Sequence, residues 1–174
     1  MNINITNICF KGHLKCLINI KHLYNVENKI KMKFQPEKFP GLILFFPFGT
    51  CLVFNSGYFS ICGCKVISDG YLTQVDLYEI LERNGYQINN RNLILTNVCG
   101  SFDFGRSINL IKLALSYKKE AYYDVELFPG LKFNLHNHIF TIHHTGKVFV
   151  TGMKSIKELY STCRILIDIL TELI

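Results

Sequence analysis

The sequence lacks the features that mark membrane, secreted or disulfide-bonded proteins. It has no uninterrupted stretch of about 18 uncharged apolar residues, so we expect no membrane span. The opening MNINITNICFKGHLK does not follow the basic, apolar and small-residue order of a secretion signal, which predicts that the protein is not secreted. The seven cysteines show no framework spacing, which predicts free thiols in a reducing compartment.

Acidic residues are scarce relative to basic ones. The 174 residues include 13 Asp and Glu against 19 Lys and Arg, which gives a net charge of +6. This balance permits nucleic-acid binding without establishing it. The hydrophobic fraction of 49% is enough for a real core and excludes a disordered chain. The length suits one domain, or two small halves packed as one.

The sequence repeats itself at a spacing of 89 to 90 residues. The matched blocks are TNIC at 6–9 with TNVC at 96–99, FPGL at 39–42 with 128–131, and the Gly-x-Lys of 63–65 with that of 152–154. Three blocks in the same order at one spacing predict a duplication. We therefore expect two copies, residues 1–89 and 90–174, that together form one domain with approximate two-fold symmetry.

Each copy shows the same order of predicted elements. Alternating apolar residues and Gly-containing turns predict strands at 4–11, 41–46, 50–54 and 58–62, and at 93–103, 131–135, 139–143 and 147–151. Helical stretches are expected at 14–24 and 108–116. Together with the terminal helices described next, these elements predict an α+β fold in which helices cover one side of an antiparallel sheet.

A long amphipathic helix is expected to close each copy. In the first copy the predicted buried face is Leu72, Val75, Tyr78 and Leu81, and Asn84-Gly85 ends the helix. The predicted buried face of the second helix is Leu159, Cys163, Leu166, Leu170 and Leu173.

The other side of the sheet is then left without a cover. Strand alternation assigns to it the pairs Asn7 and Cys9, Leu52 and Phe54, Ser60 and Cys62, Asn97 and Cys99, Thr141 and His143, and Phe149 and Thr151. This set is weakly polar and nearly uncharged. An uncovered face of this kind indicates a binding partner. An ordinary sheet face in contact with solvent is the alternative at this point.

Catalytic and metal-binding patterns are weak. His136, His138 and the pair His143-His144 could hold a metal on a hairpin, although histidines at a hairpin tip are more often exposed to solvent. No nucleophile, base and acid occur at usable spacing, and no Gly-rich phosphate loop follows a strand. We therefore predict no enzyme activity, no cofactor and no metal.

Longer motifs resemble a known family over almost the whole chain. The second copy reads LTNVCGSFDF, YDVELFPGLKFNL and HHTGKVFVTGMKS in order. These segments closely resemble the second repeat of TATA-binding proteins, including the ELFPGL stirrup and the S/T-G-K-x-V-x-T-G-x-K strand. ITNIC, PEKFPGL, LVFNSG and CGCK of the first copy resemble the first repeat more faintly.

The resemblance implies a saddle-shaped fold with approximate two-fold symmetry. Its curved antiparallel sheet has about ten strands, and four helices lie on the convex side. Proteins of this family bind A·T-rich DNA through the minor groove and bend it with apolar wedges, a behaviour long known for them. The implied function is that of a transcription initiation factor. It would act in the nucleus, or in a cytoplasmic factory if the chain is viral, and recruit a factor IIB-like protein and RNA polymerase.

The resemblance also implies individual roles. The amides of Asn7 and Asn97 would donate to bases, although an Asn can also simply cap a turn. Phe39, Phe54, Phe128 and His143 would stand at the wedge positions, where core packing is the alternative. The complete predicted DNA-contacting set is Asn7, Cys9, Phe39, Leu52, Phe54, Ser60, Cys62, Lys65, Asn97, Cys99, Phe128, Thr141, His143, Lys147, Phe149, Thr151 and Lys154.

Three further residues are implied to bind a partner protein. Asp124, Glu126 and Leu127 match the stirrup segment that contacts transcription factor IIB in the family, with a solvated acidic loop as the alternative. Other positions depart from the family pattern. Tyr58 replaces a phosphate-contacting lysine and His143 replaces a wedge phenylalanine. These departures favour a second hypothesis, a scaffold of the same fold that acts through protein contacts with weak or no sequence-specific DNA binding.

Overall fold

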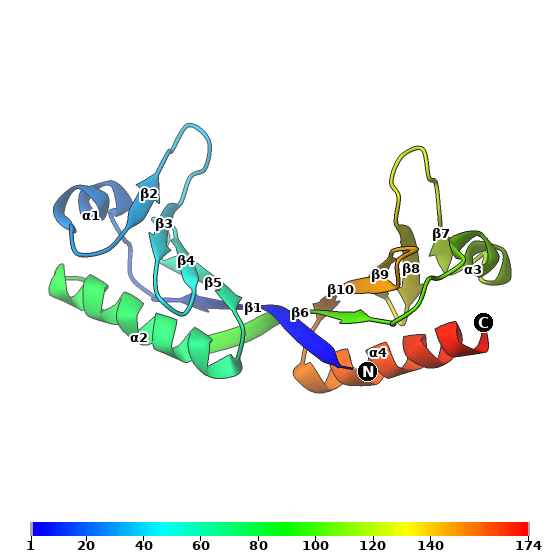
Figure 1. The fold of residues 1–174 in the computed structure, drawn as a ribbon. Helices are drawn as coiled ribbons and strands as arrows, with labels where there is room; N and C mark the ends of the chain where they lie inside the picture. Colours follow the sequence, from blue (N-terminus) through cyan, green and yellow to red (C-terminus); the bar gives the residue numbers. More distant parts are fainter. Residues whose placement is uncertain (1, 174) are drawn as a thin grey trace. The chain divides into compact units, whose positions relative to one another are not determined.

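The computed structural model describes residues 2–173 and contains ten strands and four helices within them (Figure 1). Contacts divide the chain into two compact units. The first unit is Asn7–Thr96, and the second is Asn97–Ile174 together with Met1–Thr6. The predicted α+β class, with about ten antiparallel strands and four helices, is confirmed.

In the first unit, five strands follow the order β2-β3-β4-β5-β1, and each neighbouring pair is antiparallel. The elements of this part of the chain are β1 (Ile3–His13), α1 (Ile20–Val26), β2 (Met32–Phe34), β3 (Leu42–Phe45), β4 (Thr50–Val53), β5 (Tyr58–Cys64) and α2 (Ile67–Arg83).

The second unit repeats this order of elements. Its strands follow the order β6-β10-β9-β8-β7, again antiparallel. The elements are β6 (Leu93–Asp103), α3 (Leu110–Ser116), β7 (Ala121–Tyr122), β8 (Leu131–Leu135), β9 (His138–Ile142), β10 (Lys147–Met153) and α4 (Ile156–Glu172). Within residues 2–173, no helix combines the length and apolar character that crossing a bilayer requires.

The core of each unit lies between one side of its strands and its long helix. Cys51, Val53 and Ile61 of β4 and β5 are fully buried, and α2 contacts both strands. Phe140 and Val150 occupy the equivalent positions in β9 and β10, where α4 contacts β10. Because side chains alternate along a strand, the residues between these buried ones point to the opposite side. We call that opposite side the open face of each unit.

The short helices begin later than predicted. The expected helices 14–24 and 108–116 start at Ile20 and Leu110, because the side chains of Asn19 and Asn109 cap them. Asn19 accepts a hydrogen bond from the N–H of His22 at 2.9 Å, and Asn109 accepts one from Lys112 at 2.9 Å.

Leu14 and Ile18, which precede α1, are buried without being helical. The N–H of Leu14 donates to Gly57 at 2.9 Å, and that of Ile18 donates to Asn55 at 3.0 Å. Both side chains therefore enter the core from an irregular segment, which a helical hydropathy pattern does not distinguish from a helix.

The predicted buried face of α2 is half wrong. Tyr78 and Leu81 are buried, but Leu72 is 45% and Val75 53% exposed. Gln74 is buried in their place. Its amide nitrogen donates to the Tyr78 hydroxyl at 2.7 Å and to the carbonyl of Arg91 at 3.2 Å, so burying this polar side chain costs little. For α4, burial of Leu159, Cys163, Leu166 and Leu170 is confirmed, and Leu173 is half-buried.

A buried carboxylate joins α1 to the end of α2. Glu27 accepts hydrogen bonds from Arg83 at 2.6 Å, from the Lys29 N–H at 2.8 Å and from the Asn84 amide at 3.1 Å. Burial by itself would raise the pKa of Glu27, but these donors outweigh it and lower that pKa to about 2. The charged form of Glu27 is therefore stabilised in the folded state.

We predict that Glu27→Gln lowers the free energy of unfolding at neutral pH by about 2 kcal/mol, because it removes the charged acceptor from three donors. Since the folded pKa of Glu27 lies below its ordinary value, this contribution is complete above pH 4.5 and declines as the pH falls toward 2. Urea unfolding at several pH values measures it. A difference between the two proteins that stays constant from pH 7 to pH 2 would contradict the assignment.

Candidate nucleic-acid interface

The open face of the first unit carries the predicted side chains of three strands. The side chains of β1, β4 and β5 on this face are half-buried: Asn7, Cys9, Leu52, Ser60 and Cys62, with Phe54 directly after β4. Their neighbours Ile8, Cys51, Val53 and Ile61 are fully buried on the helix side. The alternation predicted from the sequence is therefore present.

The second unit presents the equivalent set. Asn97, Cys99, Thr141 and His143 are half-buried on its open face, and Phe149 and Thr151 are exposed. Val98, Phe140, Ile142 and Val150 alternate with them and are buried. The asparagine and the cysteine recur in both sets, whereas the other four positions differ in chemistry: Thr141, His143, Phe149 and Thr151 stand where the first unit has Leu52, Phe54, Ser60 and Cys62.

The two asparagines are held by the same bond in each unit. Asn7 Oδ1 accepts a hydrogen bond from the N–H of Gly63 at 2.7 Å, and Asn97 Oδ1 accepts one from Gly152 at 2.9 Å. A backbone N–H can only donate, so the carbonyl oxygen of each amide must face the glycine. The NH2 group of each amide then points away from the glycine and makes a weak contact with a sulfur atom. Asn7 Nδ2 lies 3.3 Å from Cys9 Sγ, and Asn97 Nδ2 lies 3.3 Å from Cys99 Sγ.

The glycines occupy β-bulges. The pairing of β1 with β5 shifts register between Ile8 and Phe10, and that of β10 with β6 shifts between Val150 and Met153. Gly63 has φ +85° and Gly152 φ +92°, the left-handed region in which other residues are strained. In β5 and in β10, the bulge takes the N–H of the glycine out of the pairing between strands and directs it toward the asparagine.

A cysteine side chain lies next to each asparagine on the open face. At the β1–β5 shift Cys9 lies opposite the two residues Cys62 and Gly63, and at the β6–β10 shift Cys99 lies opposite Thr151 and Gly152. Burial raises the pKa of the Cys62 thiol, so it stays neutral at physiological pH. The middle of the open face in each unit is therefore uncharged and offers amide hydrogens as its strongest donors.

Aromatic rings gather where wedges were predicted. The Phe39 and Phe54 rings lie 5.7 Å apart at 64°, and the Phe128 and His143 rings lie 6.0 Å apart at 67°. His143 also meets the Phe149 ring at 5.9 Å and 90°. Edge-to-face contacts of this kind fix ring orientation. Residues far apart in the sequence are thus brought together in both units.

The glycine of each FPGL segment makes room for its phenylalanine. A Cβ atom on Gly41 would lie 2.6 Å from the Phe39 ring, and one on Gly130 would lie 2.6 Å from the Phe128 ring. Only glycine allows the ring to fold back over the start of the following strand at this distance. The close approach of the phenylalanine ring therefore explains why a glycine follows it in both FPGL segments.

The predicted lysines lie at the margins of the strands. Lys65 and Lys154 are exposed between the last strand and the long helix of their units, and Lys147 is exposed at the start of β10. Three exposed lysines on the open faces are not among the predicted residues: Lys11, Lys33 and Lys132. Their cross-strand partners are Ser60, Ile43 and Thr141, so the strand register would have found them.

Tyr58 occupies the position of an expected lysine. It is 58% exposed, and its ring meets the edge of the His13 ring at 4.1 Å. The first unit therefore has an aromatic pair, rather than a cation, at this corner of its open face.

The segment 124–128 is a turn built by Asp124. The Asp124 carboxylate accepts hydrogen bonds from the N–H groups of Glu126 at 3.1 Å and Leu127 at 3.3 Å. Glu126 is exposed and Leu127 is 75% exposed. Of the three residues predicted to bind a partner, Glu126 and Leu127 thus protrude, while Asp124 shapes the turn. Tyr122 and Val125, which were not among the predicted residues, are exposed as well.

The histidines of the second unit have separate neighbours. His138 Nε2 lies 3.1 Å from Glu158 Oε1, whereas His143 lies between Phe128 and Phe149. The N–H of Lys154 is the main cause of a lowered pKa of Glu158, and His138 adds to it. Within residues 2–173, no three His, Cys, Asp or Glu side chains are grouped so as to hold a metal ion.

Comparisons with known proteins agree with this architecture. The family model of transcription factor TFIID, or TATA-binding protein, matches residues 2–84 and 92–173. Therefore the chain belongs to the TATA-binding protein family. It is 31% identical over 159 residues to TATA-box-binding protein-like 1 of Entamoeba histolytica, covering 89% of this chain and 73% of that protein.

Two further comparisons extend over nearly the whole chain. The TATA-box-binding protein of Schizosaccharomyces pombe is 28% identical over 176 residues, which covers 97% of this chain and 74% of that protein. The solved structure of Methanococcus jannaschii TBP matches with a TM-score of 0.85 at 25% identity and covers 99% of both chains. The predicted TATA-binding-protein-like fold is thereby confirmed.

We predict that Gly130→Ala destabilises the protein by about 1–3 kcal/mol, because the added methyl group must displace the Phe128 ring. The melting temperature, followed by circular dichroism, measures the effect. Leu127→Ala is the matched control from the same segment, since an exposed side chain contributes little to stability. Equal melting temperatures for Gly130→Ala and Leu127→Ala would contradict the steric role of this glycine.

Proposed function

We propose that this protein is a transcription initiation factor that binds A·T-rich promoter DNA in the minor groove. Residues 1–89 and 90–174 would act as two repeats, each applying its open face to the DNA. The observation that carries the proposal is the pair Asn7 and Asn97. Their side-chain oxygens accept hydrogen bonds from the backbone N–H groups of Gly63 and Gly152. Each amide is left to act as a donor.

The chemistry of the groove matches such a donor. In the minor groove, A·T pairs present only acceptors, adenine N3 and thymine O2, whereas G·C pairs add the guanine amino group. An amide NH2 can donate to either acceptor. The neighbouring Cys9, Cys62 and Cys99 offer a guanine amino group only weak sulfur acceptors. Since burying an unpaired amino group is costly, this face disfavours G·C pairs.

The aromatic clusters would bend the DNA. A side chain inserted between base steps must offset an unstacking cost of a few kcal/mol per step. Burying a phenylalanine supplies about 1.5–3 kcal/mol. Phe39 with Phe54, and Phe128 with His143, would provide these wedges. Histidine supplies less apolar burial than phenylalanine, so the second unit would kink its step less strongly.

Phosphate contacts would come from lysines around the open faces. Lys65, Lys147 and Lys154 are joined by Lys11, Lys33 and Lys132, all exposed. Each phosphate neutralised would steepen the dependence of log affinity on log salt by about 0.9. Tyr58 in place of a lysine reduces this electrostatic term.

Recruitment would follow through the segment 124–128. A factor IIB-like protein would contact the exposed Glu126 and Leu127, and RNA polymerase would join through that factor. We place this activity in the nucleus, or in a cytoplasmic factory if the chain is viral, and assign the protein no catalytic step. The likeness to TATA-box-binding proteins supports the general role.

A second candidate is a scaffold of the same fold that acts through protein contacts. The contact of Tyr58 with His13 favours it, because two aromatic rings stand where a cation would meet phosphate. His143 favours it too, since this ring is held between Phe128 and Phe149. Weak and equal binding to A·T-rich and G·C-rich duplexes would select this alternative.

We expect Asn97→Asp to weaken binding to an A·T-rich duplex by about 1–3 kcal/mol, since carboxylate oxygens replace the donor that reads the base. The substitution keeps an acceptor for the Gly152 N–H and so preserves the local fold. Fluorescence anisotropy with A·T-rich and G·C-rich duplexes, repeated across salt concentrations, measures the affinity and the preference.

Asn134→Asp is the matched control, because Asn134 is an exposed asparagine of β8 in the same unit, on the same face as Lys132. It adds the same charge without removing the proposed base contact. If both variants lose the same affinity and retain the same preference for A·T pairs, Asn97 does not read bases and the proposal fails.

We expect Phe39→Ala and Phe128→Ala each to reduce DNA bending, because alanine cannot replace the stacking that an opened base step loses. Energy transfer between dyes at the two ends of a bound duplex reports the bend. Ile111→Ala, an exposed apolar residue of α3, is the control. Bent duplexes of unchanged end-to-end distance with both phenylalanine variants would exclude the wedge role.

A further inference from the structure

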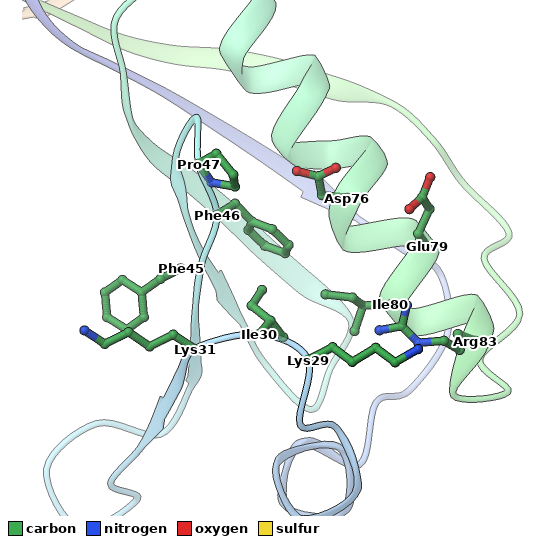
Figure 2. A pocket seen from close by; sticks show the side chains of 10 residues that line it. All are labelled: Lys29, Ile30, Lys31, Phe45, Phe46, Pro47, Asp76, Glu79, Ile80 and Arg83. Atoms are coloured by element: carbon green, nitrogen blue, oxygen red, sulfur yellow. The ribbon is translucent and has the colours of Figure 1, made fainter.

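A recess of about 360 Å³ lies in the first unit, between the β3–β4 turn and α2 (Figure 2). Its apolar lining comes from both sides: Ile30, Phe46 and Pro47 face Ile80 of α2. Charged side chains surround this lining, with Lys29, Lys31 and Arg83 on one side and Asp76 and Glu79 on another. Of the lining residues, alternation along β3 places Phe45 on the open face.

Most of its cations already have partners within the unit. Arg83 binds the buried Glu27 carboxylate at 2.6 Å. The Lys31 ammonium lies over the Phe45 ring, 5.4 Å from its centre. Lys29 is therefore the cation that is left without such an interaction among the described residues.

The two carboxylates of α2 have no comparable partner. Among residues 2–173, neither Asp76 nor Glu79 belongs to an ion pair, whereas the nearby Glu82 pairs with Arg91. Burial raises the pKa of Asp76, and the neighbouring Glu79 raises it further. Lys29 and Lys31 keep their charges on the rim, but among residues 2–173 no cation lies within ion-pair distance of either carboxylate, so a cation placed beside Asp76 and Glu79 would be favoured.

An exposed apolar stripe continues from these carboxylates along α2. Leu72 and Val75 precede Asp76 and Glu79 at helical spacings of three and four residues, so all four side chains lie on one face. Leu72 and Val75 are the residues expected in the core that the structure leaves exposed. Exposed apolar side chains that adjoin a recess mark an interaction site.

The stripe is present on α2 and is not repeated on α4, the equivalent helix of the second unit. The residues 89 positions later, on α4, are Ser161, Arg164, Ile165 and Asp168. This face of α4 has one exposed apolar residue, and a basic side chain stands in the middle. The same architecture therefore tolerates a different surface.

We propose that the α2 stripe and the adjoining recess bind a protein segment that carries a Lys or Arg side chain one helical turn from an apolar side chain. The apolar side chain enters between Phe46, Pro47 and Ile80, and the cation meets Asp76 and Glu79. An amphipathic helix presents this pair of side chains at the required spacing. Such a partner and DNA on the open face occupy different surfaces, so both can be bound at once.

Selection from a phage-displayed library of random amphipathic helical peptides tests the proposal, with the full chain as bait. The expected peptides pair Lys or Arg with an apolar residue one turn away. Each is then measured by fluorescence anisotropy. Asp76→Asn combined with Glu79→Gln should weaken binding about tenfold, the upper part of what two partly exposed ion pairs contribute. Asp168→Asn on α4 is the matched control and should leave affinity unchanged.

A second bait, Asp76→Lys combined with Glu79→Lys, separates charge recognition from a general loss of folding. This bait should select peptides with Asp or Glu in place of the basic residue. The proposal is overturned if both baits select the same peptides, if basic residues are not enriched, or if no peptide is enriched over the bare support. Self-association of the chain that disappears in the Asn/Gln variant would assign the surface to a second copy and overturn it as well.

Discussion

The hydrogen bond from a bulge glycine to an asparagine side chain determines the chemistry of each open face. An asparagine on a strand can turn either its oxygen or its nitrogen toward a ligand. The N–H groups of Gly63 and Gly152 remove that choice for Asn7 and Asn97. The bond in turn depends on a left-handed glycine at the register shift of the adjacent strand. Backbone geometry thus sets the hydrogen-bonding character of a side chain on a neighbouring strand.

Much of the fold could be predicted from the sequence because apolar and polar residues alternate along most of the strands and the pattern recurs in both copies. The strands 93–103 and 131–135 were predicted with the bounds that the structure has, and the family resemblance implied Phe39 and Phe54 as a pair of wedges, whose rings the structure brings into contact. Errors arose where hydrogen bonds override hydropathy. Asn19 delays the start of α1, and Gln74 is buried in α2 because Tyr78 and Arg91 satisfy its amide.

Other features have no local signal. Glu27 and Arg83 are 56 residues apart, and nothing in either segment indicates that the two side chains meet. The same holds for Gly63 and Asn7, although both belong to blocks that recur in the sequence. A repeat shows that positions correspond between two copies, whereas long-range pairing within a copy depends on strand register. Lys33 and Lys132 lacked a local signal for the same reason, whereas alternation with Asn7 and Cys9 places Lys11 on the open face from the sequence alone.

The unlike surfaces of α2 and α4 bear on directionality. A protein made of two equivalent halves would read a stretch of duplex equally well in either orientation, and so would not distinguish one strand from the other as the template. Leu72, Val75 and Asp76 are replaced by Ser161, Arg164 and Ile165 in the second unit, and Leu127 is replaced by Lys38 in the first. If the protein acts as proposed, factors that recognise only one unit can therefore set the direction in which transcription proceeds.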